Sequence, residues 1–142
     1  MSSVLARCAL TIALLGWVAV ANERLEFVPT SFAHFYAYAI PVFAIAAASI
    51  VLLGRAFKDT IGSHRTDWHL IVFRAVPQAA RVAFVILAVS AFAYVFLATG
   101  GSASAPTWEA AGPSLRSAFF AGFTIPALLA WVALLASARA AV

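Results

Sequence analysis

The sequence predicts an all-α membrane protein built as a bundle of four transmembrane helices. Hydrophobic residues make up 65% of the chain and charged residues only 10%, whereas soluble domains carry about 25% charged residues. Long segments without charge recur four times, and the mean hydropathy is +1.01. At about 20 residues per crossing, four helices and their connections account for nearly all 142 residues. We therefore expect one integral membrane domain over residues 1–142.

The apolar segments place the four helices at 4–21, 31–53, 82–99 and 117–137. The first is short but uncharged after Arg7, and Trp17 suits the headgroup level at its far end. The same stretch also resembles a cleaved secretion signal, since residues 19–21 form a cleavage-like triplet. Of the two alternatives we expect a retained helix.

Residues 54–81 form the long polar interval between the second and third segments and carry most of the positive charge. Because Lys and Arg are retained on the cytoplasmic side, we expect a cytoplasmic loop at 54–81, an outer loop at 100–116 and both termini in the cytoplasm. A bacterial inner membrane is the expected location. Five basic residues of the interval form an expected rim for lipid headgroups: Arg55, Lys58, Arg65, Arg74 and Arg81.

The second half of this interval has two interpretations. Asp67 precedes an apolar run that starts at Trp68, so a short helix capped by Asp67 could lie along the inner interface until Pro77 turns the chain. Alternatively, the run is the solvated start of the third helix.

The two halves of the chain also match each other, which suggests a duplicated helical hairpin. Residues 35–41 share the pattern Phe, any, small, aromatic, any, Ile, Pro with residues 120–126, and residues 7–12 resemble residues 81–86. A duplication in the same orientation predicts two hairpins related by a two-fold axis along the membrane normal.

Small residues predict where the helices pack, because they let backbones approach closely in lipid. Each of two helices has a face of small residues, which we expect to serve contacts within the bundle before contacts with another subunit. These stripes are Ala33, Ala37, Ala44 and Ala48 in the second helix, and Ala118, Gly122, Pro126, Ala130 and Ala133 in the fourth.

His34 is the candidate for chemistry near the membrane, since an ionisable group inside an apolar segment is a functional candidate. The alternative, which we favour, is an interfacial histidine that is hydrogen-bonded to a neighbour. With Tyr36 and Tyr38 it could bind a quinone or a lipid headgroup; no other cofactor is expected. Transmembrane haem held by two histidines is disfavoured, because His64 and His69 lie on the other side.

Other chemistry finds little support. His64, Asp67 and His69 have a spacing that does not suit one helical face, so we interpret them as solvated polar residues and expect no metal site. No Asp or Glu lies inside an apolar segment, and no phosphate loop or nucleophile motif occurs. The sequence therefore does not predict an enzyme.

Abundant packing surface with little chemistry favours a non-catalytic accessory or scaffolding subunit of a larger energy-converting or transport assembly. The expected partners are other membrane subunits and lipids; nucleic acid is not expected, because the basic residues sit beside membrane crossings. The alternatives are a small homo-oligomeric transporter or channel, with kinks at Pro41 and Pro126, and a quinone- or lipid-binding membrane subunit.

Overall fold

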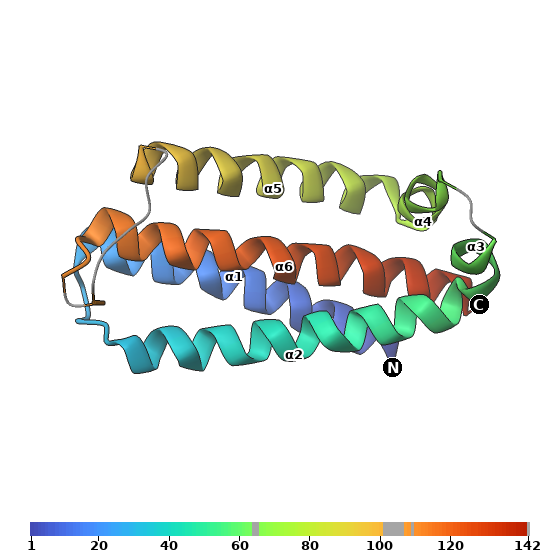
Figure 1. Cartoon of the computed structure of the whole chain (residues 1–142), viewed down its shortest axis with the longest axis horizontal. Helices are drawn as coiled ribbons and strands as arrows, with labels where there is room; N and C mark the ends of the chain where they lie inside the picture. The colour runs from blue at the N-terminus through green and yellow to red at the C-terminus, as the bar shows by residue number, and fades with distance from the viewer. Residues whose placement is uncertain (64–65, 101–106, 109, 142) are drawn as a thin grey trace.

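The computed structural model describes residues 1–63, 66–100, 107–108 and 110–141, and this part of the chain is helical, with no strand. Four long helices lie alongside one another: α1 (Ser2–Leu25), α2 (Phe32–Ala56), α5 (Gln78–Thr99) and α6 (Pro113–Ala140) (Figure 1). Two short helices, α3 (Lys58–Gly62) and α4 (Trp68–Ala75), connect α2 to α5. Each long helix is long and apolar enough to cross a membrane. The predicted all-helical fold and its four apolar helices are thus confirmed.

The helices extend past the predicted segments at most of their ends. α1 continues through Asn22 to Leu25, and α6 begins at Pro113 instead of residue 117. The 28 residues of α6 span about 42 Å at 1.5 Å per residue, which exceeds the hydrocarbon core of about 30 Å. Hydropathy detects only the apolar part of a helix, so it predicts helices that are too short.

The interval after α2 contains an independent short helix. Asp67 occupies the N-cap position of α4, and Val76 is extended, with φ −75° and ψ 141°. Because a residue before proline disfavours the helical region, Pro77 separates α4 from α5. Figure 1 shows α4 turned across the end of α5. Of the two interpretations, the separate helix is the one observed, and α5 begins at Gln78 rather than residue 82.

α6 is the central helix. It packs against α1, α2, α4 and α5, and its most extensive contact is with α1. The face that α1 buries consists almost wholly of small residues (Ala6, Ala9, Ala13, Gly16 and Val20), which allow close approach of the two backbones. α5, in contrast, buries only Ala91, and its main neighbour is α6.

The two hairpins do not pack equivalently. A two-fold axis that exchanges α1 with α5 and α2 with α6 would repeat the α1–α6 contact between α5 and α2. No comparable contact joins α5 and α2. The packing therefore departs from the two-fold relation that a duplicated hairpin predicts.

Both chain ends lie at the same end of the molecule as α3 and α4 (Figure 1). This end, which we call the basic end, carries Arg7, Arg55, Lys58, Arg74, Arg81 and Arg139. The opposite end holds the α1–α2 connection and the start of α6.

Candidate functional site

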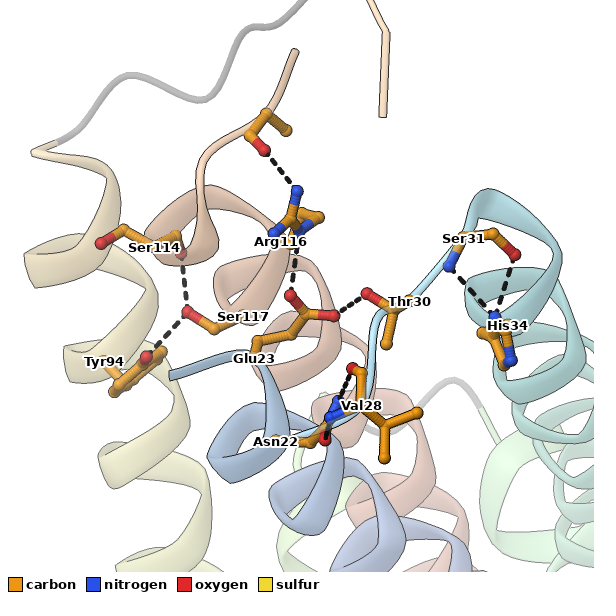
Figure 2. A network of polar contacts seen from close by, with 11 residues as sticks. Asn22, Glu23, Val28, Thr30, Ser31, His34, Tyr94, Ser114, Arg116 and Ser117 are labelled. Carbon is orange, nitrogen blue, oxygen red and sulfur yellow. Dashed lines mark hydrogen bonds and ion pairs between the residues drawn. The ribbon is translucent and has the colours of Figure 1, made fainter. Parts of the chain in front are cut away.

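The three residues proposed from the sequence as a quinone or lipid site have different neighbours. His34 is exposed, and its Nδ1 accepts a hydrogen bond from the Ser31 backbone N–H at 3.0 Å (Figure 2). Together they form a capping box at the start of α2. Tyr36 is 51% exposed and packs edge-on against Phe32, with ring centroids 4.5 Å apart. His34 therefore takes part in the hydrogen bonds of the first turn of α2.

Tyr38 points into the interior, where α1, α2 and α6 meet. A Cβ atom on Gly16 would lie 2.2 Å from Tyr38 Oη and 2.5 Å from Thr124 Cγ2, so only glycine leaves room for both side chains. The Tyr38 ring also lies 5.8 Å from that of Phe120. Its hydroxyl is buried and has no hydrogen-bond partner within the described part of the chain. Tyr38 is thus a packing residue at a three-helix junction.

A buried carboxylate organises the opposite end of the molecule. Glu23, in the last turn of α1, is 3% exposed, and its Oε2 lies 2.9 Å from Nε of Arg116 on α6 (Figure 2). Its Oε1 accepts a hydrogen bond from the Thr30 hydroxyl. Arg116 Nη1 donates to the carbonyl of Ala111 at 2.8 Å. Glu23 and Arg116 thus pair with each other and with neighbouring polar groups. These contacts join α1, the α1–α2 connection and α6.

A second set of polar contacts joins α5 to the same end. The Tyr94 hydroxyl lies 2.7 Å from Ser117 Oγ, which donates to the Ser114 carbonyl at 2.7 Å (Figure 2). Arg24 Nη1 donates to Ser114 Oγ. Together with the Glu23 ion pair, these contacts fix the start of α6 against both α1 and α5.

This ion pair was not predicted from the sequence. Glu23 falls in the predicted connection after the first helix and Arg116 in the predicted outer loop, and no contact between them was expected. The two residues are 93 positions apart, so no local pattern joins them. Both residues were predicted on the same side of the membrane, and a charge beside an apolar helix is costly unless it is paired. That combination could have suggested the ion pair.

An apolar groove runs along α6 between α2 and α5, and we call it the α6 groove. Its half nearer the opposite end has a volume of about 320 Å³. Its walls are Phe43 of α2 and Val95 and Thr99 of α5. α6 supplies the remaining lining residues: Leu115, Ala118, Phe119, Gly122, Phe123 and Pro126.

The half nearer the basic end has a volume of about 360 Å³. It lies between α2 and α6 and is bordered by α4, through residues that include Ile50, Leu129 and Trp68. Pro126 lines both pockets, so the two are adjacent on α6, and we refer to them together as the α6 groove.

The predicted small-residue stripe of α6 lines this groove. All five of its residues do so: Ala118, Gly122, Pro126, Ala130 and Ala133. Ala118 and Ala130 are buried, and the other three are half-buried. On the α6 side of the groove these small side chains alternate with larger ones, namely Leu115, Phe119, Phe123, Leu129 and Val132.

The alanine stripe of α2 does not face α6. Ala33, Ala37 and Ala44 are exposed and Ala48 is half-buried. The contact face of α2 is instead the one that carries Ala39, Val42, Ile45 and Ser49. The small residues of α6 and α1 already allow close packing there, so α2 can bring larger side chains to the contact.

The basic residues expected to form a rim are distributed over several elements. Arg55, Lys58 and Arg74 are exposed and Arg81 is half-buried; Arg65 lies outside the described residues. His69 is exposed and borders the α6 groove, and His64 is also outside the described residues. Within the described residues, no cluster of three or more His, Cys, Asp and Glu side chains could hold a metal ion.

Comparisons of the chain with protein-family models, with curated proteins and with solved structures find no match.

Proposed function

We propose that the protein is a non-catalytic accessory subunit of a larger membrane complex, of the energy-converting or transport class, and that it binds a transmembrane helix of a partner in the α6 groove. The observation that carries this proposal is the row of five small residues of α6 that lines an apolar groove. Small residues allow two helix backbones to approach closely in lipid, where van der Waals packing drives association.

This row of residues also offers a backbone acceptor. Pro126 has no N–H group, so the carbonyl of Gly122 receives no hydrogen bond from the residue four positions later in α6. In lipid, such freed carbonyls are commonly satisfied by Ser or Thr hydroxyls. We expect the partner helix to bring a small face with a Ser or Thr to this level.

The orientation in the membrane belongs to the same proposal. The basic end carries most of the described Lys and Arg residues, while Glu23 and Glu26 lie at the opposite end with Arg24 and Arg116. By the positive-inside tendency, we assign the basic end with both termini to the cytoplasmic face of a bacterial inner membrane, with the four long helices as the transmembrane bundle.

The homo-oligomeric transporter or channel is the second candidate, but the polar groups inside the helices do not favour it. Ser49, Thr124 and Ser137 are buried, and each donates its hydroxyl hydrogen to a carbonyl of its own helix, at 2.7, 2.6 and 2.8 Å. These hydroxyls complete local hydrogen bonds rather than form a path for a solute. Quinone or lipid binding around His34, Tyr36 and Tyr38 would require their side chains to reorient.

Site-specific photo-crosslinking in native membranes tests the proposal. Leu129 lines the groove and is 54% exposed, while Leu14 on α1 is 48% exposed and serves as the control position. A photoreactive residue at position 129, but not at 14, should crosslink to another polypeptide. A crosslink between two copies of this chain would instead support the homo-oligomer, and crosslinks to lipid alone at both positions would refute a partner helix.

A groove-filling variant supplies the second arm. A Cβ on Gly122 would be 3.8 Å from Val95 Cγ2, so Gly122→Leu should fold, yet its side chain projects into the groove. We expect it to lower copurification of the crosslinked partner at least about tenfold. Gly54→Leu is the matched control, because nothing lies within 4 Å of its Cβ. Equal copurification with both variants would contradict the groove as the binding site.

A further inference from the structure

A second surface pocket lies at the corner where α4 meets α5, at the basic end. Its volume is about 370 Å³, and it is lined by Phe73, Gln78, Arg81, Val82, Val85 and Ile86. It shares only Phe73 with the lining of the α6 groove, so it is a separate site and does not depend on the proposed partner helix.

The lining changes from polar to apolar along the axis of α5. Gln78 and Arg81 lie in its first turn, at the basic end. Val82, Val85 and Ile86 follow toward the middle of the helix and are 53%, 48% and 60% exposed. Because α5 is long and apolar enough to cross a membrane, this order runs from the headgroup level toward the hydrocarbon. An amphiphile with its charged group at the interface matches this order.

Charge selects the kind of amphiphile. Arg81 forms no ion pair with any other described residue, and its Nε is buried without a hydrogen-bond partner there. Arg74, in the last turn of α4, adds a second positive charge to the α4–α5 corner. An unpaired guanidinium at the membrane surface favours a phosphate group, which it can bind through two parallel hydrogen bonds.

We infer that this pocket binds one anionic phospholipid, whose phosphate lies at Gln78 and Arg81 and whose acyl chain lies along Val82, Val85 and Ile86. The aliphatic strip provides nonspecific burial, and Arg81 provides the preference for negative charge. The lipid fills the corner between α4 and α5, both of which otherwise pack mainly on α6.

Lipid retention by the purified full-length chain tests the inference. Protein in mixed micelles with equal amounts of phosphatidylglycerol and phosphatidylcholine would be analysed by native mass spectrometry. We expect retention of one phosphatidylglycerol, and a drop of about fivefold in its preference over phosphatidylcholine in Arg81→Gln, as expected for one basic residue near the surface. Arg81→Lys should keep most of the preference.

Arg55→Gln is the matched control, because Arg55 is exposed at the same end but does not line the pocket. If Arg55→Gln and Arg81→Gln lower the preference equally, the effect is general surface charge and the inference fails. It also fails if the wild-type chain retains both lipids equally.

A measurement on the wild-type chain guards against misfolding of the variants. A phosphatidylglycerol with a photoreactive group in its acyl chain should label the peptide that contains residues 82–89 more than the exposed apolar face of α1. Uniform labelling of both helices would overturn the inference.

Discussion

Replacing Gly16 by alanine tests the junction at which α1, α2 and α6 meet. The new Cβ would lie 2.2 Å from Tyr38 Oη, 2.5 Å from Thr124 Cγ2 and 2.9 Å from Tyr38 Cζ. All three distances are below 3.0 Å, which real Cβ contacts essentially never show. The side chains of Tyr38 and Thr124, or the helices that carry them, must therefore shift.

The expected cost follows from which neighbour can move. The Tyr38 hydroxyl is at the far end of a side chain, but Thr124 is fully buried and its hydroxyl donates to the Ala121 carbonyl at 2.6 Å. Its β-branched side chain has few alternative rotamers. Overpacking of this kind costs about 1–3 kcal/mol, and alanine regains about 1 kcal/mol of helix propensity over glycine. We therefore expect a net loss of about 0–2 kcal/mol in the free energy of unfolding.

Unfolding in micelles, followed by circular dichroism, measures this loss, and other glycines of the chain supply the controls. In Gly122→Ala the new atom meets Val95 Cγ2 at 3.8 Å, an ordinary contact, and in Gly54→Ala it meets nothing within 4 Å. Both should be neutral or stabilised by up to about 1 kcal/mol. Adding Tyr38→Phe to Gly16→Ala should recover part of the loss, because it removes the atom nearest to the new Cβ. Equal shifts in all three alanine variants would refute the described junction.

The same unfolding assay checks three further predictions. Glu23→Gln should lower the free energy of unfolding by about 2 kcal/mol, because it leaves Arg116 without its charged partner. A double-mutant cycle with Arg116→Gln should give a coupling energy of at least about 1 kcal/mol. Additive effects of the two substitutions would contradict the ion pair. Glu26 ends α1 with φ 53°, in the left-handed region, so Glu26→Gly should raise stability by about 0.5–1 kcal/mol, and a loss would show that its side chain matters. Ser31→Ala should cost about 1 kcal/mol by removing the N-cap hydroxyl from the capping box with His34, whereas no change would mean that the cap contributes nothing.

The four apolar helices could be predicted because hydrophobic composition alone determines which segments can lie in lipid. Their ends could not, since Asn22 to Leu25 are helical although three of the four are polar, and Glu23 among them pairs with Arg116, which is distant in the sequence. The separate helix α4 could be proposed from the sequence, because Asp67 takes the N-cap position and Pro77 restricts the backbone of the residue before it. Features that depend on local residues or on hydrophobicity could be predicted from the sequence. Contacts between distant segments could not.

The positions of the small-residue stripes could be predicted from the sequence, but the helices that pack on them could not. The stripe of α6 marks a face where a backbone can approach, and it lines the α6 groove. The stripe of α2 has the same composition, yet Ala33, Ala37 and Ala44 are exposed. A stripe shows that close packing is permitted, but its neighbours decide whether the packing occurs. The face that α1 presents to α6 also went unnoticed, although Ala6, Ala9, Ala13 and Gly16 repeat at helical spacing.

The alignment of the two halves indicates why the α6 groove exists. If residues 7–12 correspond to 81–86, then α1 corresponds to α5, and the small residues Ala13 and Gly16 correspond to Leu87 and Ser90. α1 packs closely on α6 through its small residues, whereas Leu87 adds bulk on the corresponding face of α5.

The same offset pairs Val20 of α1 with Tyr94 of α5, whose ring lies 6.0 Å from that of Trp17 and whose hydroxyl bonds to Ser117. Tyr94 thus contacts α1 and α6 rather than α2, and α5 does not repeat on α2 the contact that α1 makes on α6. A partner helix with its own small face could pack in the α6 groove as closely as α1 packs on the other side of α6. The open groove is the basis of our proposal that another subunit completes the packing, and Gly122→Leu, which fills the groove, should weaken that association.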